Sequence, residues 1–246
     1  MTKTVHGVLN RWPVAGLAVG VVRDGELAWF HGHGVADVES GRPVDEDTVF
    51  RIGSITKTMT AVAVMQLVER GVLDLDAPAA DYLRGYSLRP AKPTFAPVTV
   101  RHLLTHTAGV RAVRGPADLL RPTLGWGTRP GHAAPPLAEY YRGGLRVDVE
   151  PGTRFAYSNH GFATLGQIVE DVSGVPFDRY LRERVFGPLG MGDSDLVRSE
   201  RVRPRLATGH ELRPGGSRRS RTARPCPPAP PGSTSPPATW PATPRR

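Results

Sequence analysis

The first part of the chain alternates short apolar runs with turn-forming residues, a pattern that is typical of β-strands. Apolar residues dominate positions 18–22 and 27–30, and Asp24-Gly25 lies at the centre of the four residues between them. An Asp-Gly pair readily adopts the positive φ angles of a tight primed turn. The pattern therefore predicts a β-hairpin, which would be marginally stable unless other strands join it.

The middle of the chain has the longer apolar runs of helices. The run at 55–68 is apolar on nearly all sides and ends near Gly71, which predicts a helix inside a domain rather than on its surface. Thr99 is a suitable cap for a short helix at 101–104, because its hydroxyl can accept a bond from a free N–H group. Further helices are expected from Ser158 or Asn159 to about 172, with Gly174 as the stop, and near 176–185.

Residues 111–150 interrupt this helical pattern. They are rich in Gly, Pro and Arg, and we predict a long loop or an inserted cover. Pro151-Gly152 predicts a turn, and 154–157 a short strand. Strands followed by a mostly helical middle indicate an α+β fold, although no closing set of strands for the hairpin is visible.

Most of the net charge of +9 on the 246 residues lies at one end of the chain. Residues 213–246 contain seven Arg and no acidic residue, so residues 1–212 carry only about +2. Such a body lacks the broad basic face that nucleic-acid binding requires, and we predict no nucleic-acid partner. The Pro/Arg-rich composition of 213–246 cannot bury a core, so this tail is predicted to be disordered.

The sequence contains little that indicates a membrane, a disulfide or a metal cluster. Cys226 is the only cysteine, which excludes an internal disulfide and a cysteine-based metal site. No run approaches the roughly 18 apolar residues of a membrane span, and the chain does not begin with a secretory signal. We therefore expect a cytoplasmic protein without membrane contact, cofactor or metal.

Ser54 and Lys57 are the first candidates for catalysis. They are three positions apart at the start of a predicted helix, so their side chains share one face. A serine needs a neighbouring base to become a nucleophile, and a lysine can be that base if burial lowers its pKa. The first N–H groups of the helix would also favour a developing oxyanion. A solvated helix start that happens to carry both residues is the alternative.

Tyr157 and Asn159 form a second candidate group, between a turn and a predicted helix. The phenol of Tyr157 can pass a proton between the nucleophile and a leaving group. Asn159 can donate to a substrate carbonyl and orient Lys57. As an alternative, an aromatic residue beside a helix cap is commonly part of the core.

Together these motifs resemble two of the three motifs of the serine β-lactamase and penicillin-binding-protein family. Tyr157-Ser158-Asn159 resembles the Tyr-x-Asn motif of its class C branch, and neither the Ser-Asp-Asn motif nor the water-activating glutamate of the class A branch is evident. The resemblance covers about 13–212 and implies a β-lactamase/transpeptidase-like fold, with an antiparallel sheet and an all-helical region. The segments that resemble the family's nucleophile segment and its next two landmarks are 50–61, 71–76 and 99–109.

The resemblance also implies roles for the four residues. Ser54 would attack an ester or amide carbonyl to form an acyl-enzyme, and Lys57 would accept its proton. Tyr157 would relay that proton to the leaving group, and Asn159 would bind the substrate. The substrate would be a small ester, a β-lactam or a D-amino-acid peptide, and the lack of a signal sequence favours an esterase over a cell-wall peptidase. The oligomeric state is left open.

The family's third motif, Lys-Thr-Gly or His-x-Gly on a late strand, is not found after Asn159. Its nearest candidate, His210, lacks the following Gly. In the family this strand supplies half of the oxyanion hole, so the domain at 1–212 is expected to lack its C-terminal strands. Read one nucleotide earlier, the codons of 232–244 can encode a segment that resembles the family's next landmark. We hypothesise a frameshift between about 209 and 225, with a natural disordered tail as the alternative.

Several further residues are more ordinary candidates. His31 and His33 share one face of a strand, but no third metal ligand is apparent. His106 lies in a segment that resembles one beside the family's active site, and packing or hydrogen bonding is favoured over direct proton transfer. The aromatic residues expected to line the substrate entrance or to fill a loop are Trp126, Tyr140 and Tyr141.

Three functions remain open on the sequence. The first is a serine hydrolase of the resembled family. The second is a catalytically impaired remnant of that family, truncated or frameshifted. The third is an anion-binding module that acts through the basic tail, of which 218–221 is the best fragment. We favour them in this order, because the body lacks a basic face.

Overall fold

The computed structural model describes residues 1–110 and 136–209, which form two compact units. Of these residues, the sheet unit contains 1–51 and 190–209, and the helical unit contains 52–110 and 136–189. Trp126, His210 and the tail at 213–246 lie outside the described residues, so what the sequence predicts for them stays a prediction.

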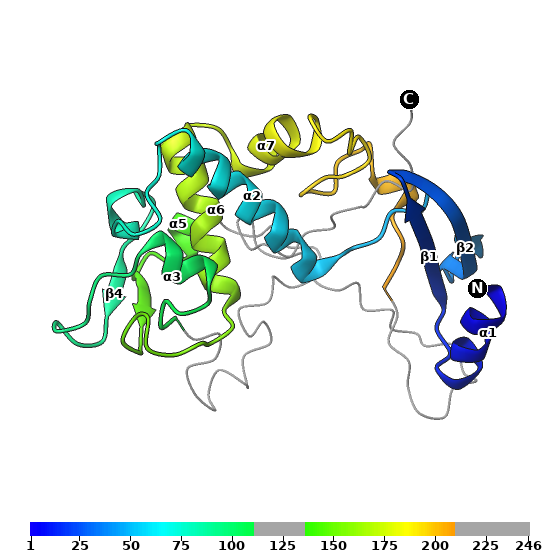
Figure 1. The fold of residues 1–246 in the computed structure, drawn as a ribbon, viewed down its shortest axis with the longest axis horizontal. Helices are drawn as coiled ribbons and strands as arrows, with labels where there is room; N and C mark the ends of the chain where they lie inside the picture. Colours follow the sequence, from blue (N-terminus) through cyan, green and yellow to red (C-terminus); the bar gives the residue numbers. More distant parts are fainter. Residues whose placement is uncertain (111–135, 210–246) are drawn as a thin grey trace. The chain divides into compact units, whose positions relative to one another are not determined.

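The sheet unit is built on the predicted hairpin (Figure 1). β1 (Gly16–Arg23) and β2 (Glu26–Asp37) are antiparallel, and the short β3 (Arg42–Pro43) extends the sheet in the order β1-β2-β3. Asp24 and Gly25 have φ angles of 51° and 82°, as a primed turn requires, so the hairpin is confirmed. The helix α1 (Thr2–Arg11) buries Leu9 and is mostly exposed, and the sequence analysis does not predict it.

The chain returns to the sheet unit after its helices. The Val49 N–H donates to the carbonyl oxygen of Arg205 at 2.9 Å, and the Ala207 N–H donates to that of Val49 at 2.8 Å. The Arg42 guanidinium donates to the Leu206 carbonyl at 2.8 Å. These partners lie far apart in the sequence, so no local pattern predicts their contact.

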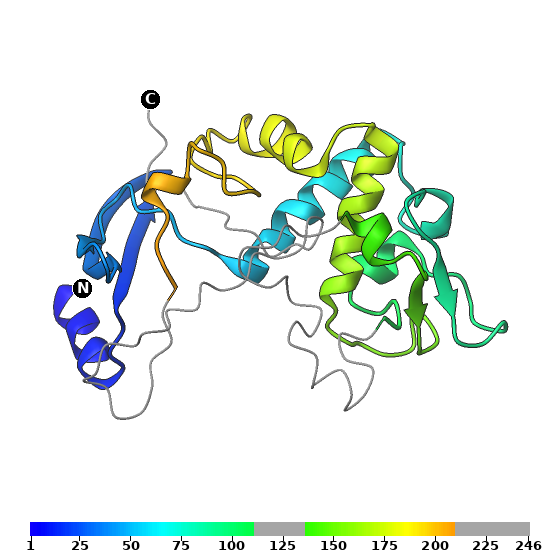
Figure 2. The same ribbon diagram turned by 180° about the vertical axis from the view of Figure 1, so that it is seen from behind.

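The helical unit packs two long helices against each other (Figure 1, Figure 2). α2 (Thr56–Glu69) lies against α6 (Asn159–Ser173), and α3 (Val100–Leu104) and α7 (Phe177–Leu181) also contact α6. All four helices are predicted by the sequence, and Gly174 ends α6 in the left-handed conformation with a φ of 68°. The shorter helical turns of this unit include η1 (Gly53–Ile55), η2 (Ala79–Asp81) and the π-type η3 (Arg182–Phe186), whereas η4 (Arg203–Arg205) belongs to the sheet unit.

The prediction that the helix at 55–68 is buried on nearly all sides is wrong. Ala63, Val64 and Leu67 are buried on one face of α2, whereas Val62 and Met65 on another face are 39% and 45% exposed. The elements that contact α2, which include α6, α7 and η3, leave Val62 and Met65 at the surface. Single exposed apolar residues are common on protein surfaces. None of the helices in the described residues is both long and apolar enough to cross a membrane.

Two further predictions are corrected by the long-range contacts of the helical unit. The described part of 111–150 is not all loop, because α5 (Leu137–Tyr140) lies in it and β5 (Leu145–Val147) pairs in parallel with β4 (Leu88–Pro90). The segment at 154–157 has no regular secondary structure and so is not a strand. The Ala156 N–H donates to the carbonyl oxygen of His106 at 2.8 Å, so this segment bonds to the loop after α3 instead of a strand.

The substitution Gly109→Ala is expected to destabilise the protein by about 3 kcal/mol or more. Gly109 has a φ of 72°, and a Cβ atom at this position would overlap the carbonyl oxygen of Val149. Gly174→Ala is the matched control, because its φ is 68° but nothing lies within 4 Å of the added Cβ. The control substitution is expected to lower the free energy of unfolding by about 1–2 kcal/mol. Urea unfolding of both variants measures the difference, and equal losses would show that the chain relaxes around the new methyl group at Gly109.

Candidate active site

Ser54 lies in the short 3₁₀ turn that leads into α2. It is the middle residue of η1, which runs directly into α2, and its side chain is exposed. Lys57 lies in the first turn of α2 and is only 7% exposed. The spacing of three residues therefore places both side chains on one side of the helix start, as the sequence predicts.

Tyr157 and Asn159 are positioned by the start of α6. The Ser158 hydroxyl accepts the N–H of Gly161 at 3.3 Å, so Ser158 is the cap and Asn159 is the first helical residue. Tyr157 directly precedes the cap, in a segment without regular secondary structure. Because α6 packs against α2, its start meets the start of α2.

Three hydrogen bonds join the four predicted site residues. Ser54 Oγ lies 2.6 Å from Tyr157 OH, and either oxygen can be the donor. Lys57 Nζ donates to Ser54 Oγ at 3.2 Å and to Asn159 Oδ1 at 2.7 Å. Ser54 Oγ is therefore within hydrogen-bond distance of two groups that can exchange a proton with it.

Aromatic rings lie beside the amino group of Lys57. Its Nζ is 4.8 Å from the ring centre of Tyr157 and 5.7 Å from that of Phe162, within the range of a cation–π attraction. The sequence analysis does not single out Phe162. Its position three residues after Asn159, on the same face of α6, is the signal that could have found it.

His106 packs against Tyr157. Its ring centre lies 4.5 Å from that of Tyr157 and 4.9 Å from that of Phe162, and its Nδ1 accepts the backbone N–H of Ser158 at 3.3 Å. Burial and the positive charge of Lys57 hold the pKa of His106 below its ordinary value. The contacts that the structure gives His106 are packing and hydrogen bonding, the kinds favoured by the sequence analysis.

The two tyrosines at the end of α5 have different surroundings. Tyr141 is buried, with its ring centre 4.7 Å from that of Tyr86 and its hydroxyl 2.5 Å from Nδ1 of His160. Tyr140 is partly exposed and packs edge-on against Tyr141. Tyr141 is therefore a core residue. Of the two tyrosines, only Tyr140 is exposed enough to contact a substrate.

His31 and His33 lie on β2 in the sheet unit. The His31 ring stacks on Trp29 at 5.8 Å and meets His6 edge-on at 5.4 Å. Over residues 1–110 and 136–209, no three His, Cys, Asp or Glu side chains are grouped so that they could hold a metal ion. The contacts that the structure gives His31 are those of an aromatic cluster.

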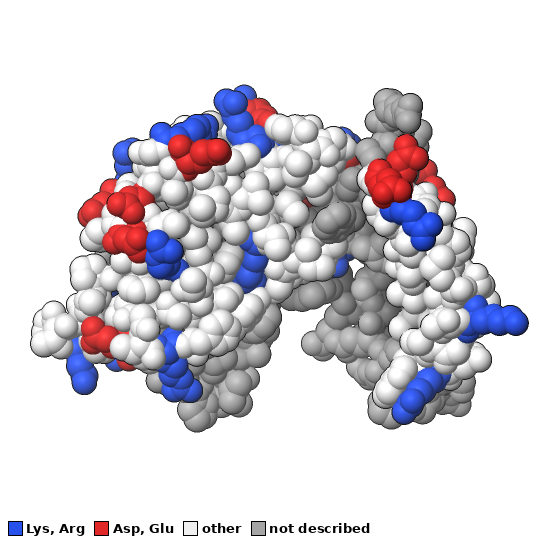
Figure 3. Space-filling model, viewed as in Figure 1, with Lys and Arg blue, Asp and Glu red and all other residues white. Residues whose placement is uncertain are grey.

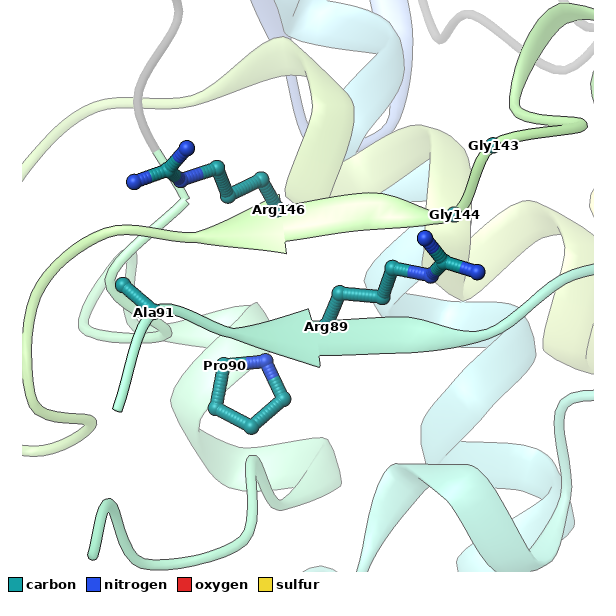
Figure 4. A pocket seen from close by; sticks show the side chains of 6 residues that line it. All are labelled: Arg89, Pro90, Ala91, Gly143, Gly144 and Arg146. Carbon is teal, nitrogen blue, oxygen red and sulfur yellow. The ribbon is translucent and has the colours of Figure 1, made fainter. Parts of the chain in front are cut away.

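A separate hollow of about 360 Å³ lies on β4 and β5 (Figure 4). Its charged lining residues, Arg89 and Arg146, are paired in register across the two strands. Figure 4 shows their guanidinium groups pointing away from each other, that of Arg89 toward Gly144. Arg146 is paired with Asp148 at 2.6 Å. The two cations do not converge on one ligand, and none of the four site residues lines this hollow.

Charged side chains of both signs are interspersed on the face of the molecule shown in Figure 3. Among the described residues, Arg101 pairs with Asp76 at 2.6 Å and Arg179 with Glu183 at 2.7 Å. Such exposed pairs contribute little to stability, because solvent screens their charges.

The chain matches the family model described as Beta-lactamase over residues 6–245. It is 36% identical over 199 residues to penicillin-binding protein 4 of Amycolatopsis lactamdurans, a match that covers 80% of this chain and 49% of that protein. It is 37% identical over 184 residues to esterase EstB of Burkholderia gladioli, covering 73% of this chain and 46% of that protein. The chain thus spans about half the length of the curated relatives that it matches.

A solved structure has a similar fold. The octameric penicillin-binding protein homologue from Pyrococcus abyssi matches with a TM-score of 0.73 and 29% identity, covering 98% of this chain and 53% of that chain. This similarity confirms the predicted α+β fold class, with its antiparallel sheet and its helical region.

Proposed function

Because the chain belongs to the beta-lactamase family, we propose that it is a serine hydrolase in which Ser54 attacks an ester or amide carbonyl. The observation that carries this proposal is the position of Ser54 Oγ, 2.6 Å from Tyr157 OH and 3.2 Å from Lys57 Nζ. A serine oxygen with two proton-exchanging neighbours has what acyl transfer requires of a nucleophile.

Each of the four residues has a role in the proposed reaction. As Ser54 Oγ bonds to the carbonyl carbon, its proton passes to the amine form of Lys57, and Tyr157 carries the proton to the leaving alcohol or amine. Asn159 Oδ1 accepts an N–H from Lys57 and so orients it. The amide N–H groups of Asn159 are then the donors for the substrate carbonyl. Water finally attacks the acyl-enzyme, and Ser54 regains its proton as the acid is released.

The proposed substrate is a small ester, a β-lactam or a D-amino-acid peptide. Relatives named as an esterase and as a penicillin-binding protein support this range. In each substrate a carbonyl carbon carries a leaving group, so the same attack by Ser54 applies. We propose testing small activated esters first, because their alcohols need the least protonation in order to leave.

Covalent labelling with a fluorophosphonate probe tests the proposal. Ser54 Oγ is expected to attack phosphorus and displace fluoride, and intact mass is expected to rise by the probe less hydrogen fluoride. Ser54→Ala should abolish the adduct. Ser40→Ala is the matched control. Ser40 is also exposed, but its hydroxyl donates to Asp37 and is not placed between a lysine and a tyrosine as Ser54 is.

The labelling results are interpreted only for protein samples that are shown to be folded. A single adduct that Ser54→Ala removes and Ser40→Ala keeps would support the proposed nucleophile. Folded protein that takes no adduct, or an adduct that persists in Ser54→Ala, would contradict the proposal and favour a catalytically silent member of the family.

A further inference from the structure

We propose that His106 is a positioning residue of this reaction: in its neutral form it holds Tyr157 beside Ser54, and its protonation switches the reaction off at acidic pH. The inference rests on the proposed function of Ser54. It is carried by the hydrogen bonds on both sides of Tyr157, by the rings that contact His106, and by the charge that faces it.

His106 bonds to the chain on both sides of Tyr157. Its carbonyl oxygen accepts the Ala156 N–H at 2.8 Å, and its Nδ1 accepts the Ser158 N–H at 3.3 Å. An acceptor at Nδ1 requires the neutral ring with its proton on Nε2, because both nitrogens of an imidazolium are donors. Protonation would therefore break the second of these bonds and turn an N–H of His106 toward that of Ser158.

The His106 ring is part of the wall against which Tyr157 is held. Its centre lies 4.5 Å from the Tyr157 ring, 4.9 Å from Phe162 and 5.8 Å edge-on from Phe155. A shift of His106 would move the Tyr157 hydroxyl relative to Ser54 Oγ, where the present separation is 2.6 Å. Proton transfer depends steeply on such a distance, so a displaced Tyr157 loses its role.

The charge around His106 opposes its protonation. Of the described residues, the titratable groups that face it are Lys57 from α2 and Tyr157 from the segment before α6, while α6 itself contributes Phe162. No carboxylate of these residues contributes to the titration of His106. Protonation would place a second cation near Lys57, which with burial explains why the pKa of His106 lies below its ordinary value.

The backbone of His106 allows a closely matched variant. His106 has a φ of 58°, in the left-handed region where asparagine is among the better tolerated residues. The Oδ1 atom of asparagine can accept the Ser158 N–H in place of Nδ1, and asparagine does not titrate. His106→Asn therefore keeps an acceptor for the Ser158 N–H but removes the titrating ring and its contacts with Tyr157. Its labelling at each pH is for that reason compared with its own rate at neutral pH. His33→Asn, on β2, is the control for loss of a histidine elsewhere.

The test is the pH dependence of fluorophosphonate labelling. Acid protonates Lys57, the proposed base, and this alone reduces labelling by about tenfold for each pH unit. Protonation of His106 is expected to make the wild-type fall steeper than this below a midpoint that is lower than the ordinary histidine value of about 6.5. His106→Asn should lose only this steeper part, and His33→Asn should retain it. If His106→Asn is labelled and keeps the steeper part, the inference is overturned.

Nuclear magnetic resonance separates this inference from the proposed function. The Ser158 amide resonance is expected to titrate together with the His106 ring, and to stop doing so in His106→Asn. If the wild-type protein is not labelled at any pH, the proposed function fails. In that case the inference about His106 is tested only by the pH dependence of the Ser158 amide resonance. If that resonance does not titrate together with the His106 ring, the inference is overturned.

Discussion

Replacing Lys57 with methionine is expected to slow the acylation of Ser54 by about 10³- to 10⁴-fold, a loss of about 4–5.5 kcal/mol of transition-state stabilisation. Methionine keeps the unbranched apolar stem but cannot take the proton from Ser54 Oγ, which lies 3.2 Å from Nζ. It also leaves Asn159 Oδ1 without the donor at 2.7 Å. The measurement is the second-order rate constant of fluorophosphonate labelling, followed by intact mass.

The control for this change is Lys92→Met, because Lys92 is exposed in the loop after β4. It is expected to change the rate by less than about threefold, as is usual for a surface substitution. The fold of Lys57→Met is checked by its unfolding transition. A folded Lys57→Met protein that is labelled at the wild-type rate would exclude Lys57 as the proton acceptor and leave Tyr157 as the remaining neighbour of Ser54 Oγ.

Tyr157→Phe is expected to reduce turnover by about 10²- to 10³-fold. Phenylalanine keeps the ring that lies 4.5 Å from His106 and 4.8 Å from Lys57 Nζ, so the packing of the site is preserved. It removes the hydroxyl that lies 2.6 Å from Ser54 Oγ. Because Tyr157 is proposed to protonate the leaving group, the loss should be greater for an ester of a simple alcohol than for a p-nitrophenyl ester. The ratio of the two kcat/KM values measures this difference.

Tyr82→Phe is the matched control for Tyr157→Phe. The Tyr82 hydroxyl accepts the Asp74 N–H at 3.0 Å. Tyr82→Phe therefore also removes a hydrogen-bonded tyrosine hydroxyl, but one outside the candidate active site. It is expected to lower stability by about 1 kcal/mol without altering the ratio for the two esters. An equal loss of kcat/KM for both esters in Tyr157→Phe would argue that Tyr157 acts before the leaving group departs, as a base for Ser54.

Local features of this protein could be predicted from the sequence because they depend on short-range geometry. The pairing of Ser54 with Lys57 follows from the three-residue spacing at the start of a helix. The Asp24-Gly25 turn and the stop at Gly174 follow from the backbone angles that these residues tolerate. The resemblance to family motifs then named Tyr157 and Asn159 as well, although nothing in their own neighbourhood fixes what they contact.

Local patterns failed where long-range packing decides the outcome. The apolar run of α2 does not show that Val62 and Met65 stay exposed, because that depends on which neighbours cover the helix. The strand predicted at 154–157 is absent because its backbone bonds to the loop at His106. The parallel pair β4 and β5 joins segments more than fifty residues apart, a contact that no periodicity within either segment reveals.

By itself, the sequence determined the helices α2, α3, α6 and α7, the hairpin and the four side chains from which a serine nucleophile can be built. Only the tertiary structure decided that Ser54 Oγ meets Tyr157 OH, and that His106 and Phe162 surround the pair. The physical reason is that torsional preferences and periodicity act over a few residues. The distance between Ser54 and Tyr157, 103 positions apart, is instead set by how the buried faces of α2 and α6 pack against each other.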